Sequence, residues 1–523
     1  MESDSAMHPS VHAQANPAKP AIIMAGSGQV ITFGELDARS NQVAQLFRAK
    51  GIGVGDTVAI CMENHPAYFA LAWGAQRAGL HYVCISSRLT APEVAYILED
   101  SGAKLLFTSA YLAPVMDEVA GLAPGVPQLR FGTDGADSAD AALDAMPTTP
   151  IADERAGVDM LYSSGTTGRP KGVKIPLPDD PSIAQNNSLA DLARMAFGIK
   201  EDAVYRSPAP LYHAAPLRWS MTVHKVGGTV VVMEKFDPED ALAAIERYQV
   251  TDSQWVPTHF VRMLKLDEDV RKKYDTSTLK CAIHAAAPCP VPVKHAMIDW
   301  WGPVLFEYYA GTEGNGFTFI SSPEWLQRPG SVGRALTGIV RVCDENGDEV
   351  PRGTEGQIFF EPTDLTAKPF EYHNDPVKTA ESRNKHGWTS LGDVGIQDED
   401  GYVFLTDRKS FMIISGGVNI YPQEIENLLV LHPKVADAAV IGAPDPDMGE
   451  RVVAVVQPLD MADAGPSLAE ELHAYLAPQL SRVKMPRQID FREQLPREAT
   501  GKLYKRLLRD EYKAAYEQAQ AGG

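Results

Sequence analysis

Apolar and polar positions follow two rhythms over the first third of the chain. Residues 57–62, 81–86 and 104–109 are short apolar runs rich in β-branched and aromatic side chains, and they predict buried strands. Residues 67–79, between the first two runs, carry apolar side chains at helical spacing and end at a glycine. Such an alternation of strands and helices predicts a sheet with helices on both faces.

Further strand and helix signals continue this pattern toward the middle of the chain. The apolar run 227–233 predicts a strand, a helix is expected to begin at Asp237, and another is expected over Val291–Trp301. Earlier, Thr90 has the character of an N-cap and Glu93 follows three residues later, which is the spacing of a capping box. These signals extend the α/β pattern over most of the first 300 residues.

The pattern changes at two later places. After about Gly330, short apolar runs separated by turn residues predict an antiparallel β subdomain. After Asp407, strand and helix patterns return, and the chain ends in a charged amphipathic helix. We therefore predict an α/β protein with a large domain over residues 1–408 and a small α+β domain over residues 409–523. The segment 131–150 is small and polar, and it predicts a surface loop or linker.

Composition narrows the classes of function. The chain has 523 residues, which is too long for a single core, and a net charge of −20 from 48 basic and 68 acidic residues. An acidic chain repels nucleic-acid phosphates, so no nucleic-acid partner is expected. The five cysteines never form a CxxC pair, which favours reduced thiols over disulfides or a zinc site.

The N-terminal residues and the longest apolar stretch bear on location. The first residues are polar and do not have the pattern of a signal peptide. The longest apolar stretch contains Gln76, Arg77 and His81, so it predicts a helix followed by a strand and no integral membrane segment. A cytoplasmic protein is therefore expected.

The stretch YSSGTTGRPKG, residues 162–172, directly follows an expected strand. Glycines allow backbone N–H groups to approach an anion closely, hydroxyls add hydrogen bonds, and Lys171 adds a positive charge. The spacing does not match the P-loop of kinases and GTPases, because Lys171 is followed by Gly172 where that motif needs Ser or Thr. The stretch therefore predicts a phosphate-binding loop of another kind.

This stretch and six others, in order, resemble the motifs of acyl- and aryl-CoA synthetases of the adenylate-forming superfamily, including bacterial fatty-acyl-CoA synthetases. The resemblance extends from about Thr32 to Lys502. The six further motifs are PAPLYH ending at His213, HAAAPCP at 284–290, YYAGTEG at 308–314, SLGDVG containing Asp393, LTDRKSFMIISGGVNIYP containing Arg408, and PREATGK ending at Lys502.

The resemblance implies roles for the residues in these motifs. Glu313 would hold Mg²⁺, Thr312 would bond the α-phosphate, and Asp393 with Arg408 would bind the ribose. Lys502 would bridge the carboxylate and the α-phosphate. Ala286, Ala287 and Tyr309 would line the adenine slot. The phosphate loop would use Ser163, Ser164, Gly165, Thr166, Thr167, Gly168 and Lys171. Thr166, Glu313, His213 and Lys502 are the residues that this resemblance assigns to catalysis.

The resemblance also implies an acyl pocket and a mobile C-terminal domain. His213 would form a wall or gate of the pocket, with Ala214, Trp255, Val256 and Gly311 as further candidates. Because these candidates are mostly apolar, a hydrophobic carboxylic acid is expected as substrate. The C-terminal domain would turn about Ser410, where many relatives carry Asp or Lys, and Gly416 and Gly417 would line the channel for the pantetheine of CoA.

The implied function is an ATP- and Mg²⁺-dependent acid–CoA ligase. It would convert a fatty, aryl, arylalkanoic or steroid side-chain acid into an acyl adenylate with release of pyrophosphate, and then into an acyl-CoA. A standalone adenylation enzyme that loads a carrier protein in trans is the alternative, and an oxygenating adenylate-former is a third reading. The expected partners are the acid, ATP and CoA, and a homodimer is compatible with this function.

Overall fold

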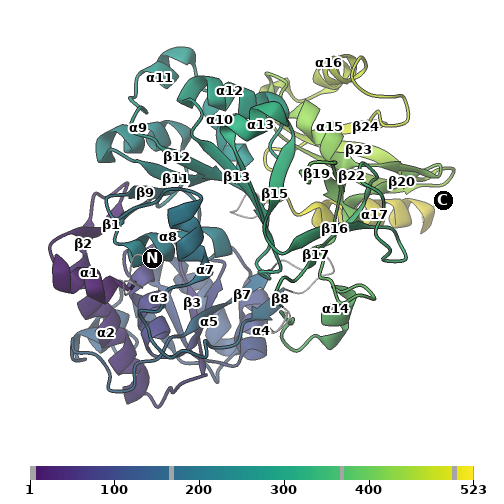
Figure 1. The fold of residues 1–523 in the computed structure, drawn as a ribbon. Coiled ribbons are helices and arrows are strands. Elements are labelled where there is room, and N and C mark those ends of the chain that lie inside the picture. The colour runs from purple at the N-terminus through teal and green to yellow at the C-terminus, as the bar shows by residue number, and fades with distance from the viewer. Residues whose placement is uncertain (1–6, 164–169, 365–369, 498–502, 522–523) are drawn as a thin grey trace.

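The computed structural model describes residues 7–163, 170–364, 370–497 and 503–521. Within these residues the chain forms a six-stranded sheet, a thirteen-stranded sheet and a five-stranded C-terminal sheet (Figure 1). The two larger sheets and their helices form alternating layers. The expected α/β class with a large first domain and a small second one is confirmed.

The first sheet has a parallel core, with its strands in the order β6-β5-β3-β4-β7-β8. Helices α4 (Ala91–Ser101) and α5 (Ala113–Leu122) pack on one face, and α2 (Phe33–Ala49) and α3 (Tyr68–Arg77) on the other. Thr90 caps α4 in a capping box with Glu93, as the sequence predicts. The strands are β3 (Thr57–Cys61), β4 (His81–Ile85), β5 (Ala103–Ser109), β6 (Gln128–Phe131), β7 (Val158–Ser163) and β8 (Lys171–Lys174).

The strands of the second sheet follow the order β16-β17-β18-β19-β15-β14-β13-β12-β11-β9-β10-β1-β2. Neighbouring strands are parallel from β13 to β1, and antiparallel from β13 to β16 and between β1 and β2. The expected antiparallel subdomain is therefore the continuation of this sheet, joined to it through β15. Its strands are β1 (Pro20–Met24), β2 (Val30–Thr32), β9 (Val204–Ser207), β10 (Thr229–Val232), β11 (Asp252–Trp255), β12 (Cys281–His284), β13 (Leu305–Ala310), β14 (Phe317–Ser321), β15 (Ser331–Thr337), β16 (Ile339–Cys343), β17 (Gly356–Glu361), β18 (Asp393–Gln397) and β19 (Val403–Arg408).

Two hydrophobic cores lie on the two faces of the second sheet. The core shared with the first sheet contains Trp219 of α8 (Ala214–Val226) and Tyr308 of β13, with α7 (Ser188–Met195) packed beside them. The other core contains Trp255 and Phe260. It is covered by α9 (Pro238–Tyr248), α10 (Pro257–Leu264) and α12 (Val291–Trp301), with α11 (Glu268–Lys272) and α13 (Ser322–Gln327) nearby.

The loop expected over residues 131–150 is only partly a loop. Helix α6 (Ala139–Asp144) forms there, with the Ser138 side chain accepting from the Ala141 backbone N–H. Ala139 and Leu143 are one turn apart and are fully buried in the first core. The prediction was wrong for this stretch because only two apolar residues, Ala139 and Leu143, are needed to pack this short helix against the core.

The C-terminal domain has its own sheet, and the change of sheet falls between Arg408 and Ile413. Hydrogen bonds join this domain to the large one. The hydroxyl of Tyr421 donates to Glu355 of the large domain at 2.5 Å, and Lys265 of the large domain donates to the Val435 carbonyl. The elements of the domain are η2 (Lys409–Phe411), β20 (Ile413–Ser415), β21 (Val418–Ile420), α15 (Pro422–Leu429), β22 (Val435–Asp445), β23 (Gly449–Pro458), η3 (Met461–Asp463), α16 (Pro466–Leu476), β24 (Gln488–Phe491) and α17 (Lys505–Ala521).

Among the described residues, no helix is both long enough and apolar enough to cross a membrane. All five cysteines are free thiols, and four of them are buried.

Candidate active site

Asp393 is held by two side chains from neighbouring strands. The hydroxyl of Tyr309 donates to its Oδ2 at 2.7 Å, and the Nε of Arg408 lies 3.2 Å from its Oδ1. Asp393 begins β18 and Arg408 ends β19, and the two residues are direct partners in the sheet. The Asp393 carboxylate raises the pKa of Arg408, which keeps the guanidinium charged. The structure thus brings three of the predicted nucleotide-binding residues together.

Glu313 lies just beyond the end of β13, close to a second aromatic side chain. The hydroxyl of Tyr372 donates to Glu313 Oε1 at 2.9 Å. Gly311 leaves room for this carboxylate, since a Cβ on Gly311 would lie 2.7 Å from Glu313 Oε2 and 2.6 Å from Leu391 Cδ2. Any larger residue at position 311 would therefore displace Glu313 or Leu391.

Lys171 lies near Glu313. Its ammonium is 5.2 Å from the centre of the Tyr372 ring, a cation–π contact. Burial and the nearby Lys378 lower the pKa of Lys171, although Asp375 and Glu313 oppose this effect. One tyrosine therefore contacts both the predicted metal ligand and the predicted phosphate-binding lysine.

The predicted adenine-binding residues follow the end of β12. Ala286 has a φ of +75°, in the left-handed region that costs an L-residue about 1–2 kcal/mol. The side chains of Ala286 and Ala287 are exposed. Two small, exposed side chains leave space for a flat ring at this turn.

Below this turn lies a buried ion pair. Lys294 of α12 donates to Glu307 of β13 at 2.6 Å, and His284 lies 3.6 Å from the same carboxylate. All three side chains are almost completely buried. The pair fixes α12 to the sheet under the Ala286 turn.

His213 precedes α8, and its ring centre lies 4.4 Å from that of Tyr212. Ala214 is the first residue of the helix. One turn further, Arg218 pairs with Asp159 at 2.8 Å and donates to the Thr312 carbonyl at 3.2 Å. Sequence analysis missed this charged pair beside Thr312. The signal that could have revealed it is a lone arginine in the apolar run of α8.

Trp255, a predicted pocket residue, lies away from His213. Trp255 packs on Phe260 and Trp301 in the second core, on the opposite face of the sheet from α8. The alternation of β11 explains this placement, because Gln254 faces the first core and accepts from Tyr205 there. Val256 follows β11 as the cap residue of α10.

Several predicted residues cannot be placed beside this site. Gly416 and Gly417 form the exposed turn between β20 and β21, with φ of +56° and +78°, and a Cβ on Gly416 would meet only Met448. Ser410 is exposed in η2, and its carbonyl accepts from Arg509 at 3.0 Å. Ser163 ends β7. The following predicted residues lie outside the described residues: Ser164, Gly165, Thr166, Thr167, Gly168 and Lys502.

The donor set near Glu313 suits a magnesium ion bound together with phosphates. Within the described ranges, no cluster of three or more His, Cys, Asp or Glu could hold a metal by itself. Mg²⁺ is usually held by one or two carboxylates plus substrate phosphates and water. A single carboxylate oriented by Tyr372, with Lys171 nearby, therefore fits such an ion.

Comparison with known proteins shows the family of this chain. The chain matches the family described as AMP-binding enzyme over residues 10–366, and its C-terminal domain family over residues 424–502. It is 33% identical over 518 residues to a fatty acid–acyl-carrier-protein ligase of Streptomyces coeruleorubidus, covering 96% of this chain and 95% of that protein. It is equally identical, over the same length, to the long-chain-fatty-acid–CoA ligase FadD13 of Mycobacterium tuberculosis, covering 96% and 97%.

Solved structures with a similar fold include enzymes bound to ATP or to an acyl adenylate. The ATP-bound MatB of Rhodopseudomonas palustris superposes with a TM-score of 0.79 at 30% identity, covering 98% of this chain and all of that one. The o-succinylbenzoate–CoA synthetase of Bacillus subtilis, bound to its acyl adenylate, superposes with a TM-score of 0.77 at 27% identity, covering 96% and 97%.

Proposed function

This chain belongs to the AMP-binding enzyme family of AMP-forming acid–thiol ligases, and from that premise we propose that it joins a hydrophobic carboxylic acid to CoA in two steps. In the first, a carboxylate oxygen of the acid attacks the α-phosphorus of ATP, and pyrophosphate leaves. In the second, the thiol of CoA attacks the acyl carbon, and AMP leaves. The observation that carries the proposal is that two carboxylates, Asp393 and Glu313, are each oriented by a tyrosine hydroxyl and that both lie near Arg408.

The nucleotide would extend from Asp393 and the Ala286–Ala287 turn to Lys171. Asp393, fixed by Tyr309 and Arg408, would accept from the ribose hydroxyls, because an ionised carboxylate is an acceptor only. The Ala286 and Ala287 turn would admit the adenine. The positive charge of Lys171 would offset the negative charge of the phosphates.

Glu313 would hold Mg²⁺, which when bound neutralises phosphate charge. Thr312 would bond the α-phosphate, and Thr166, Thr167 and the glycines around them would bind the outer phosphates. Lys502 would bridge the attacking carboxylate and the α-phosphate as a mobile point charge.

A hydrophobic acid is the substrate class that we infer from the surroundings of His213 and Ala214. His213 immediately precedes α8, and Ala214 is the first residue of this helix. Trp219 of the same helix donates to the Tyr308 hydroxyl in the apolar first core. Arg218, the charged residue of this region, is already bound to Asp159. The pair therefore presents no net charge to a substrate.

The second step would require the C-terminal domain to turn about Ser410. In this structure the Gly416–Gly417 turn is exposed and contacts Met448 of its own domain. Figure 1 shows β20 on the outer side of the C-terminal domain. A rotation would bring these glycines to the large domain, where only glycine allows close approach of the pantetheine.

A cytoplasmic location and a homodimer remain predictions from the sequence. Sedimentation of the purified protein over a range of concentrations tests the dimer.

The test of the proposed reaction is pyrophosphate release by the purified protein with ATP, Mg²⁺ and a panel of fatty, aryl, arylalkanoic and steroid side-chain acids. Each acid is assayed with CoA, with a phosphopantetheinylated carrier protein, and with neither. Turnover that requires CoA and yields the acyl-CoA by mass spectrometry supports the proposal. Turnover that requires the carrier protein would instead make the chain a carrier-loading ligase.

A further inference from the structure

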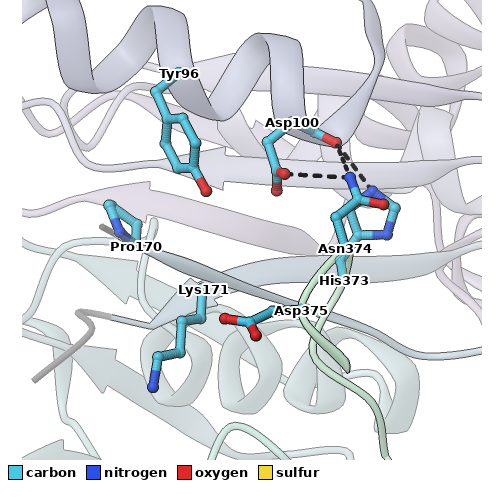
Figure 2. Close-up of a pocket in the computed structure, with 7 residues that line it drawn as sticks. All are labelled: Tyr96, Asp100, Pro170, Lys171, His373, Asn374 and Asp375. Atoms are coloured by element: carbon cyan, nitrogen blue, oxygen red, sulfur yellow. Dashed lines mark hydrogen bonds between the residues drawn. The ribbon is translucent and has the colours of Figure 1, made fainter. Parts of the chain in front are cut away.

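Asp100, near the end of α4, joins two segments that are distant in sequence. Its Oδ2 accepts from the hydroxyl of Tyr162 on β7 at 2.6 Å. Its Oδ1 accepts from the side-chain amide of Asn374 at 3.2 Å, and its backbone carbonyl accepts from the ring of His373 at 2.9 Å. Figure 2 shows Asp100, His373 and Asn374 in contact along one wall of a cavity. Both carboxylate oxygens are thus engaged by side chains.

The place of Asp100 in its helix makes these contacts informative. It is the penultimate residue of α4, where a negative charge opposes the helix dipole. Its side chain therefore does not stabilise the helix to which it belongs. The negative charge of Asp100 is instead stabilised by hydrogen bonds from Tyr162 and Asn374, which lie outside the helix. Burial and the Asp100 charge raise the pKa of Tyr162, so its hydroxyl stays protonated as the donor.

The segment that carries His373 and Asn374 leads directly to the predicted magnesium ligand. The backbone N–H of His373 donates to the Gly172 carbonyl at 2.8 Å, and Tyr372 forms a β-bridge with Val173 of β8. The Tyr372 hydroxyl then donates to Glu313. A continuous set of contacts therefore runs from Tyr162, through Asp100, to Glu313.

A cavity of about 300 Å³ lies between Asp100 and Lys171. In Figure 2, Tyr96 and Asp100 lie on one side of it, and Lys171 and Asp375 lie on the other. Tyr162 and Lys171 are on the two strands, β7 and β8, that flank the predicted phosphate-binding residues. Asp100 is not itself one of the predicted phosphate-binding residues. It contacts the segments beside them through Tyr162 and through residues 373 and 374.

The geometry points to Asp100 as a positioning residue for the phosphate end of the ATP site, which holds β7 and the Tyr372–Asn374 segment in one arrangement. This inference rests on the proposed function, since that function assigns the ATP site. It has a specific consequence. AMP lacks the two outer phosphates that this region would bind, so losing Asp100 should weaken binding of Mg·ATP and leave binding of AMP unchanged.

The test measures calorimetric affinities of the full-length protein for Mg·ATP and for AMP. Asp100→Asn keeps the size of the side chain but replaces one acceptor oxygen with a donor. We expect the Kd for Mg·ATP to rise about five- to tenfold, the effect of losing one hydrogen bond, and the Kd for AMP to stay within about twofold. Tyr162→Phe should give the same selective loss. The double variant should lose less affinity than the sum of the two single losses, because both variants weaken contacts of the same Asp100 side chain.

A matched control comes from the opposite side of the large domain. The hydroxyl of Tyr274 donates to Glu239 at 2.7 Å, the same type of contact between α9 and the chain after α11. Tyr274→Phe should leave both affinities unchanged. Thermal unfolding of all variants reports any general loss of structure.

Two outcomes would overturn the inference. One is an unchanged affinity of Asp100→Asn and Tyr162→Phe for Mg·ATP. The other is an equal loss of affinity for AMP, which a general structural defect would cause. Failure of the proposed function appears differently, as wild-type protein that binds Mg·ATP but releases no pyrophosphate with any acid. Wild-type protein that does not bind Mg·ATP would overturn both.

Discussion

The hydroxyl of Tyr372 donates to the carboxylate of Glu313 at 2.9 Å, while the ring of the same tyrosine lies beneath the ammonium of Lys171. Tyr372 therefore sets the positions of one negative and one positive group. In an enzyme that handles ATP, these are the two kinds of group that the phosphates and their metal ion require. The hydroxyl and the ring can be tested separately.

We predict that Tyr372→Phe lowers kcat/KM for Mg·ATP by about ten- to a hundredfold, because a hydrogen bond to a charged group contributes roughly 1.5–3 kcal/mol. The ring and its contact with Lys171 remain, so the apparent requirement for Mg²⁺ should rise more than the KM for CoA. Pyrophosphate release over a Mg²⁺ titration measures this. An unchanged Mg²⁺ requirement would show that Tyr372 does not orient Glu313 as a metal ligand.

The left-handed backbone of Ala286 predicts a stabilising substitution. Ala286→Gly removes about 1–2 kcal/mol of strain but adds about 0.4–1 kcal/mol of unfolded-state entropy, so a net gain of about 0.5–1 kcal/mol is expected. Ala287→Gly is the matched control, because φ is not positive there and the same change should destabilise the protein. Denaturant midpoints of the two variants should therefore move in opposite directions.

His224 predicts a loss of stability in acid. Trp73 donates to its Nδ1 at 3.3 Å, and its Nε2 lies 3.1 Å from the Ala21 carbonyl, so the neutral ring with a proton on Nε2 fits both partners. Burial lowers the pKa of His224 to about 3, from the model-peptide value of 6.5. Between these values the unfolded chain binds a proton that the folded protein does not.

The free energy of unfolding should therefore fall as the pH drops from about 6.5 toward 3, by up to about 1.4 kcal/mol per pH unit from this group. His224→Gln should reduce that slope by up to one proton, and unfolding measured at several pH values tests this. If the unfolding free energy of the variant changes with pH as steeply as that of the wild type, the lowered pKa assigned to His224 is contradicted.

Lys502→Ala should separate the two proposed steps. We expect pyrophosphate release to fall by more than about a hundredfold, because a charge placed at the reacting phosphate typically contributes several kcal/mol. Thioester formation from supplied acyl adenylate and CoA should remain largely intact. Equal loss of both steps would rule out the role given to Lys502.

Elements with strong local patterns could be predicted from the sequence. Helix α4 begins with a capping box, and β3 is a short, mostly apolar run whose residues are all buried. Residues close together in the sequence are therefore enough to predict both elements. Helix α6 was missed because its burial depends on Ala139 and Leu143 meeting a core built by other segments. Trp255 was assigned to the pocket because an aromatic residue near the motif region does not reveal which face of a strand it occupies.

The contacts around the candidate site could be predicted less well. The motif order pointed to Asp393, Tyr309, Arg408 and Glu313, but not to Tyr372, which orients Glu313. Asp100 and His373 are 273 positions apart, and no local pattern links them. Such pairs become visible only when the fold places the end of α4 against the segment after residue 370.

The measurement that tests the proposed reaction most directly is the fate of the carboxylate oxygens of the acid. An acid from the panel that supports turnover, labelled with ¹⁸O at both carboxylate positions, is incubated with the protein, ATP, Mg²⁺ and CoA, and the AMP is analysed by mass spectrometry. If the acid attacks the α-phosphorus, each AMP carries one ¹⁸O and the acyl-CoA keeps the other. Unlabelled AMP, or label found in inorganic phosphate with ADP as the nucleotide product, would contradict an acyl-adenylate reaction.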